Sequence, residues 1–118
     1  MYDIIILTTT KGQTMHTSVA GPLTAGTSLQ GYITSTLRDI SEVFGEPTFY
    51  YPGDKVTVEW GIQFEDGTIA TIYDWKRYED APEADEVLEY HIGGNSSAAV
   101  NAVSDALRIR ARISSLGA

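Results

Sequence analysis

The alternation of residue types on either side of Asp66-Gly67 restricts the fold of this chain most. Apolar and polar residues alternate over residues 56–65, and residues 68–75 continue in a β-branched and aromatic pattern. Alternation with a period of two is typical of a strand that buries one face. Asp-Gly is a preferred pair for the two-residue type I′ turn that joins two antiparallel strands. The sequence therefore predicts a β-hairpin centred on this dipeptide.

A two-residue turn also fixes which residues face each other across the hairpin. It places Trp60 opposite Tyr73 on one face, and Glu59 opposite Asp74 on the other face. We expect the first face to be buried beneath a helix, because it carries most of the large apolar side chains. These are Val58, Trp60, Ile62, Phe64, Ile69, Tyr73 and Trp75.

Two amphipathic segments predict helices over residues 36–44 and 96–116. Thr36 is a suitable N-cap for the first helix, and Gly45 is a typical residue just beyond a helix C-terminus. Pro47 prevents the helix from resuming. We expect the apolar stripe of the first helix to cover the aromatic face of the hairpin.

Further strands are predicted over residues 86–92 and, as an N-terminal hairpin, over residues 4–10 and 14–19. Strands and helices in this order indicate an α+β fold, with an antiparallel sheet of about four to five strands and both helices packed on it. At 118 residues, the chain has the length of a single compact domain, 1–118.

The composition narrows the classes of function. There is no cysteine, so disulfide frameworks, thiolate metal sites and cysteine nucleophiles are excluded. The 16 acidic and 8 basic residues give a net charge of −8, which disfavours direct nucleic-acid binding. The apolar run Ile4–Leu7 is too short for a signal peptide or a membrane span. We expect a soluble protein without a membrane partner.

Seven carboxylates between Asp74 and Glu89 form an acidic segment with aromatic neighbours. Such a surface suits docking on a basic groove of another protein. A solvated loop without a partner is the alternative interpretation. The candidate partner-binding residues are Trp75, Tyr78, Glu79, Asp80, Glu83, Asp85 and Glu86.

A second candidate site would bind an anion such as a nucleotide phosphate. Glycines and hydroxyls lie at the predicted start of the second helix and in a Gly- and Thr-rich loop over residues 21–32, and backbone amides in such places favour anions. Helix caps and ion pairs with the acidic segment are the structural alternative. The candidate ligand-binding residues are Gly93, Gly94, Asn95, Ser96, Thr27, Ser28, Arg108 and Arg110.

An enzymatic site is the third possibility. If strand 86–92 lies beside Asp74, then Glu59, Asp74, Glu89 and His91 share one face. Carboxylates with an imidazole suit an oxygen-preferring divalent metal or general acid/base catalysis. A solvated polar face explains the same residues, and the spacing matches no metal-ligand motif. We therefore assign no catalytic or metal-binding residue, and we expect neither an enzyme nor a cofactor.

Several motifs, taken together, resemble small accessory proteins of tailed bacteriophages. They are GTSLQGYIT (26–34), FGEP (44–47), FEDGTIATIYDWK (64–76) and HIGG (91–94). The resemblance covers residues 26–103 and implies a location in the cytoplasm of the infected bacterial host. A helix ending in FGEP before an antiparallel sheet is also similar in architecture to SmpA/OmlA and β-lactamase-inhibitor-protein units.

The resemblance to phage accessory proteins implies that this protein acts by binding. The first expectation is an inhibitor that docks on a host protein, one of defence or one that the phage takes over, through the acidic surface. The alternative is an oligomeric sponge that sequesters a nucleotide-type immune signal. A homo-oligomer fits either function, because a Thr-rich N-terminal strand would leave a sheet edge exposed.

Overall fold

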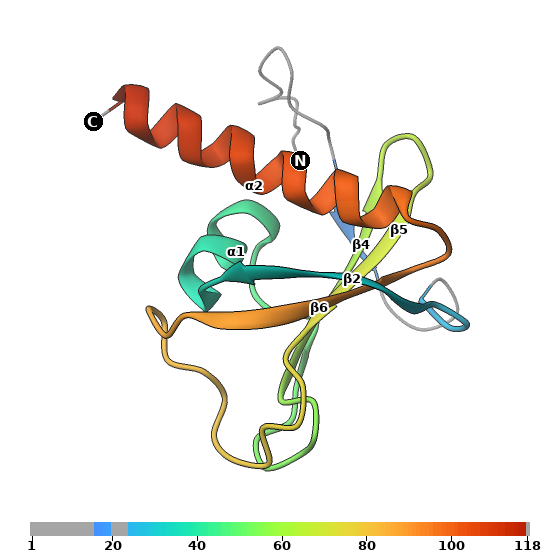
Figure 1. The fold of residues 1–118 in the computed structure, drawn as a ribbon, viewed down its shortest axis with the longest axis vertical. Coiled ribbons are helices and arrows are strands. Elements are labelled where there is room, and N and C mark those ends of the chain that lie inside the picture. The colour runs from blue at the N-terminus through green and yellow to red at the C-terminus, as the bar shows by residue number, and fades with distance from the viewer. Residues whose placement is uncertain (1–15, 20–23, 118) are drawn as a thin grey trace.

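The structure is a computed structural model that describes residues 16–19 and 24–117, with the backbone alone for residues 110–117. An antiparallel six-stranded sheet carries two helices (Figure 1), which confirms the predicted α+β class with more strands than expected. The strand order is β1-β4-β5-β6-β2, and β3 also pairs with β4. The elements are β1 (His16–Ser18), β2 (Ser28–Ser35), α1 (Leu37–Phe44), β3 (Phe49–Tyr50), β4 (Val58–Phe64), β5 (Ile69–Tyr73), β6 (Leu88–Gly94) and α2 (Ala98–Gly117).

Both predicted helices are confirmed. The Thr36 side chain caps α1 by accepting a hydrogen bond of 3.1 Å from the Asp39 N–H. Gly45 ends α1 with a φ of 86°, and its N–H donates to the Ser41 carbonyl. The helix α2 starts at Ala98, whose N–H donates to the Ser96 hydroxyl at 3.3 Å. Local sequence signals therefore set the ends of these helices.

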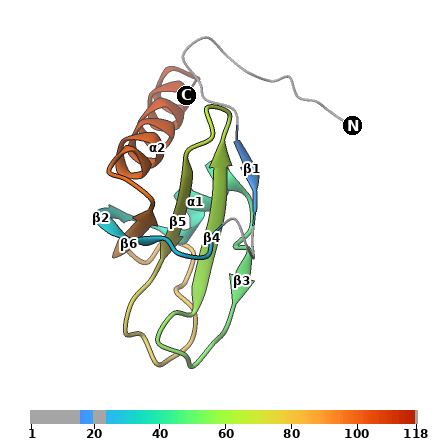
Figure 2. The ribbon, with the colours of Figure 1, turned by 90° about the vertical axis from the view of Figure 1, so that its right-hand side faces the viewer.

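The strand β2 was not predicted, because residues 28–32 were assigned to a Gly- and Thr-rich loop. It pairs with β6 at the end of the sheet, with Tyr32 opposite His91. At the other side of the sheet, β1 and β3 follow one another along β4 (Figure 2). The predicted N-terminal hairpin is tested only in part, because residues 4–10 lie outside the described residues.

The central hairpin is present, but its predicted register is wrong by one residue. Phe64 donates its N–H to the Thr68 carbonyl, and the loop between them holds three residues, Glu65 to Gly67. The Gly67 N–H also donates to the Phe64 carbonyl, and Gly67 has a φ of +92°. These contacts describe a tight turn followed by a left-handed glycine, which lengthens the loop beyond the two-residue type I′ turn.

The shift in register moves the side chains of β5 to the face opposite the predicted one. Trp60 now pairs with Ile72, and Glu59 pairs with Tyr73. Tyr73 and Trp75 therefore lie on the face away from the helices, and the prediction that they are buried beside Trp60 is wrong.

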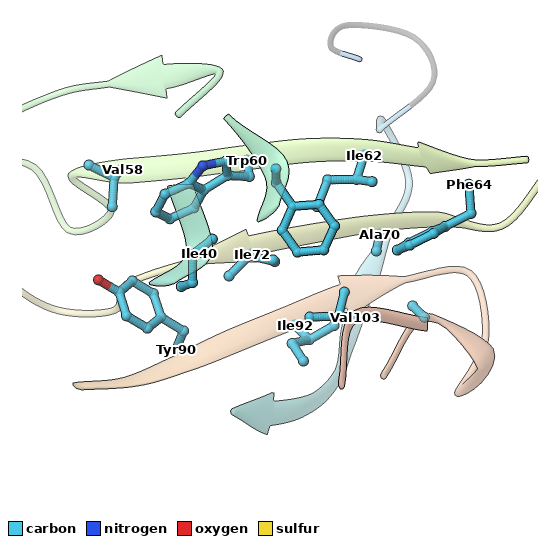
Figure 3. Close-up of a cluster of buried hydrophobic side chains, with 12 residues drawn as sticks. Ile40, Val58, Trp60, Ile62, Phe64, Ala70, Ile72, Tyr90, Ile92 and Val103 are labelled. Atoms are coloured by element: carbon cyan, nitrogen blue, oxygen red, sulfur yellow. The ribbon is translucent and has the colours of Figure 1, made fainter. Parts of the chain in front are cut away.

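The hydrophobic core lies between the sheet and the helices (Figure 3). Trp60 is 1% exposed, and its indole N–H donates to the Gly45 carbonyl at 2.8 Å. The prediction that α1 covers Trp60 is thus confirmed. The remaining core comes from alternate strand residues and both helices: Ile40, Phe44, Val58, Ile62, Phe64, Ala70, Ile72, Tyr90, Ile92, Ala99 and Val103.

Asp74 lies on the core side of the sheet and is 1% exposed. Its carboxylate accepts hydrogen bonds from the backbone N–H groups of Thr57 at 2.7 Å and Val58 at 3.1 Å, and from the Thr57 hydroxyl. The predicted contact between Asp74 and Glu59 is therefore wrong. Asp74 holds the start of β4 instead of belonging to a surface acidic group.

Candidate functional site

The sheet face opposite the helices carries a row of side chains that crosses five strands. The register places Phe49 on β3 beside Glu59 on β4, then Tyr73 on β5, His91 on β6 and Tyr32 on β2. We call this face the open face, defined by these five residues and Trp75. These residues are distant from one another in the sequence, so only strand pairing brings them together.

His91 is the centre of an aromatic group on the open face. Its ring centroid lies 4.9 Å from that of Tyr32 and 5.4 Å from those of Tyr73 and Trp75. The Tyr32 and Trp75 side chains remain 51% and 42% exposed. The ammonium group of Lys55 lies 5.1 Å from the centre of the Trp75 ring. The open face therefore presents exposed rings, one of which already contacts a cation.

Glu59 is a half-buried carboxylate within this aromatic surface. Burial raises its pKa, and its charge together with burial raises the pKa of Tyr73. On its other side, Phe49 stacks on Tyr51 with centroids 6.1 Å apart. Among the residues that the structure describes, none forms a hydrogen bond or ion pair with the Glu59 side chain. Glu59 is thus a carboxylate between two groups of rings, with no cation from residues 16–19 or 24–109 bound to it.

The segment after β5 turns sharply and presents two aromatic side chains to solvent. Lys76 and Tyr78 have φ values of 58° and 53°, in the left-handed region that residues other than glycine rarely adopt. Between them, Arg77 is anchored: its N–H donates to the Lys55 carbonyl, and its guanidinium bonds Glu86 at 2.9 Å. Trp75 and Tyr78 point outward on either side of this anchor, and Tyr78 is 60% exposed.

Apart from the buried Asp74 and the half-buried Glu86, the acidic residues of the segment are exposed, and their charge is partly compensated within the chain. Arg38 binds Asp85 through two hydrogen bonds, and it lowers the pKa of that carboxyl. Arg77 does the same for Glu86 and lies 3.8 Å from Glu79. A surface hollow of about 500 Å³ is lined by residues 83–86, three of which are acidic.

Three carboxylates of the segment, those of Asp80, Glu83 and Glu89, are exposed and unpaired within the described residues, and Glu89 projects from β6 on the open face. Of the predicted partner-binding residues, all are exposed except Glu86, which is half-buried and bound to Arg77. Arg77, which the sequence analysis did not single out, shapes the surface of the acidic segment; a lone arginine in an acidic run was the available signal.

The predicted ligand-binding residues divide into two places. Strand pairing sets Ser28 opposite Gly94, and Thr27 donates its hydroxyl hydrogen to the Thr24 carbonyl. Both glycines are buried: a Cβ on Gly93 would lie 2.5 Å from the Thr71 hydroxyl, and one on Gly94 equally close to the Ala99 methyl. Close packing therefore accounts for both glycines.

The remaining candidates lie around and along α2. Asn95 and Ser96 are exposed beside its first turn, where the Ser96 hydroxyl caps the Ala98 N–H. Arg108 is further along α2 and pairs with Asp105 at 2.8 Å. The side chain of Arg110 lies outside the described residues. The structure does not bring Arg108 to the glycines.

The four residues considered for catalysis do not share one face. Glu59, Glu89 and His91 belong to the open face, but Asp74 is buried on the core side. Within residues 16–19 and 24–117, no three His, Asp or Glu side chains are placed to hold a metal ion.

No protein-family model matches this chain, and comparison with curated proteins finds no significant match. In the described part of the chain, no helix is both long and apolar enough to cross a membrane.

Proposed function

We propose that this protein works without catalysis, by docking on a basic surface of another protein and inhibiting it. The resemblance to small phage accessory proteins supports a bacterial host protein as the partner, in the cytoplasm of the infected cell. The acidic segment, with Trp75 and Tyr78 beside it, is the surface that meets the partner.

The observation that carries this proposal is that the segment with the exposed carboxylates of Asp80 and Glu83 also exposes the rings of Trp75 and Tyr78. The backbone is left-handed at Lys76 and Tyr78, and the Tyr78 ring is 60% exposed. Strained backbone of this kind often occurs at functional sites. Exposed aromatic anchors with charged neighbours are typical of protein–protein interfaces. The rings supply contact area, and the carboxylates attract and orient a basic partner.

The nucleotide sponge is supported less well. Exposed rings on a sheet do stack nucleobases. On the open face, however, Glu59 and Glu89 would repel the phosphates. The space beside the predicted anion-binding glycines, Gly93 and Gly94, is occupied by neighbouring atoms.

Affinity capture from bacterial lysate, compared between matched variants, tests the proposal. The double variant Asp80→Asn/Glu83→Gln removes two exposed, unpaired charges beside Tyr78 in the sequence. The control Asp39→Asn/Glu46→Gln removes two exposed charges at α1. We expect the same host protein to bind the wild type and the control, and to bind the first variant at least tenfold more weakly, as two interface charges are removed. Purified components then give the dissociation constant and the inhibition of the captured protein.

Salt and ligand controls separate the alternatives. Exposed charges are screened within about 8 Å at physiological ionic strength, so binding should weaken when salt is raised to about 0.5 M. Equal retention by all three proteins would contradict the proposal. A melting temperature that rises with cyclic nucleotides, and not with the captured protein, would favour the sponge instead.

A further inference from the structure

The half-buried carboxylate of Glu59 lacks a hydrogen-bond or ionic partner among the described residues. A half-buried carboxylate is destabilised by the loss of water, and proteins usually offset this with a cation or with N–H donors. Asp74, the fully buried carboxylate at the end of this hairpin, receives three hydrogen bonds. Glu59 receives none from the residues that the structure describes. A ligand that brings a positive charge would complete its surroundings.

The neighbours of Glu59 fit a flat cation. Strand pairing places Phe49 on one side and Tyr73 on the other. Each ring belongs to a larger group, since Phe49 stacks on Tyr51 with an interplanar angle of 15° and Tyr73 contacts His91. The faces of aromatic rings attract cations, and these rings also exclude water from the carboxylate.

The protein already places one cation against this surface. The Lys55 ammonium lies 5.1 Å from the centroid of Trp75, at the border of the open face. Arg77, which follows Trp75 by two residues, is bound to Glu86 and not to Glu59. Strand pairing thus places a negative charge between two groups of rings, whose faces attract cations.

We infer that Glu59, with the rings of Phe49 and Tyr73, binds an arginine side chain of the partner protein. The identity of the partner as a basic protein rests on the proposed function. A guanidinium is planar, stacks on aromatic rings and presents two parallel N–H donors to one carboxylate. An ammonium group lacks the plane and the paired donors. The arginine therefore enters the open face, while the acidic segment attracts the surrounding basic surface.

Two peptides test this inference on the full chain, one of alternating glycine and arginine and one of alternating glycine and lysine. We expect the arginine peptide to bind several-fold more tightly, and to shift the NMR signals of residues 59, 73 and 91. Glu59→Gln should weaken arginine binding about tenfold, since a bidentate charged hydrogen bond is lost. Glu89→Gln is the matched control on the same face, and it should change binding no more than about twofold.

A second variant tests the role of the rings. Phe49→Leu keeps apolar bulk and removes the ring, so it should weaken the arginine peptide several-fold and leave the lysine peptide less affected. Thermal unfolding of each variant confirms that it is folded.

The outcomes separate this inference from the proposed function. Equal effects of Glu59→Gln and Glu89→Gln, equal affinity for the two peptides, or no binding to the wild type would each overturn the arginine site. If the Asp80→Asn/Glu83→Gln variant still loses the host protein in that case, the proposed function stands without it. Glu59-dependent arginine binding, together with host capture that ignores the acidic segment, would support the site and refute the proposed docking surface.

Discussion

Replacing Asp74 with alanine should destabilise the protein strongly, because its buried carboxylate holds the start of β4. The carboxylate accepts hydrogen bonds from two backbone N–H groups, of Thr57 and Val58, and from the Thr57 hydroxyl. Thr57 is fully buried and Val58 is 1% exposed, so water reaches these donors poorly. Removing the acceptor leaves the donors without a partner.

The magnitude follows from the number of donors. A buried donor that loses its partner costs about 1–3 kcal/mol. The hydroxyl can rotate toward another acceptor, so the two backbone groups dominate, and we expect a loss of about 3–4 kcal/mol for Asp74→Ala. For a chain of this length, each kcal/mol lowers the melting temperature by about 4 °C. Asp74→Asn keeps one oxygen for both N–H groups and should cost about 1–2 kcal/mol.

Urea unfolding followed by tryptophan fluorescence measures these differences, with the exposed Asp80→Asn as the control, expected within about 0.5 kcal/mol of the wild type. The sign of the effect also tests the register of the hairpin. If Asp74 faced Glu59 on the surface, its removal would relieve repulsion and stabilise the protein by up to about 1 kcal/mol. An Asp74→Ala variant as stable as Asp80→Asn would refute the structural argument.

Three further outcomes are expected. Burial raises the pKa of Glu59, so the native state holds this proton more tightly than the unfolded state, and stability falls as pH rises from the ordinary glutamate pKa through the raised one. Glu59→Gln should therefore raise the melting temperature at pH 7 and have little effect at about pH 3.5. Melting curves recorded over a series of pH values measure this difference. Gly61→Ala places a Cβ 2.0 Å from the Val19 carbonyl oxygen and should cost about 1–3 kcal/mol in urea unfolding, and a loss below about 0.5 kcal/mol would contradict that contact. Trp60→Phe opens a gap in the core and removes a hydrogen bond, so it should lower the free energy of unfolding by about 2–4 kcal/mol. Trp75→Phe should lower it by less than about 1 kcal/mol and should remove the tryptophan emission that iodide quenches. Equal losses of stability in the two variants would contradict the buried position of Trp60 and the exposed position of Trp75.

The register of the central hairpin shows where sequence reasoning reached its limit. Residues 65–68 are compatible with a two-residue turn and with a three-residue loop, because glycine at position 67 suits both. The difference of one residue decides which side chains of β5 face the core. Ala70 and Ile72 pack against the helices, and Tyr73 is left on the open face. No local signal distinguishes these two arrangements.

The residues that surround the candidate site also depend on the register of the central hairpin. The exposed acidic segment was predictable, since charged residues remain in solvent wherever the sheet places them. The open face was not, because Phe49, Glu59, Tyr73 and His91 become neighbours only through the pairing of four strands. Asp74 was misplaced because the register of the hairpin, shifted by one residue, turns its side chain toward Thr57 and Val58.

The amino-acid sequence alone determined the helices and the existence of the central hairpin. The signals are local, because they act through hydrogen bonds and backbone angles within a few residues of Thr36, Gly45 and the Asp66-Gly67 turn. They can therefore be recognised without knowledge of the tertiary structure. The tertiary structure alone decided which aromatic rings are buried and which surround Glu59. That choice depends on the total packing of a sheet against two helices, where shifting one strand by a residue exchanges its two faces.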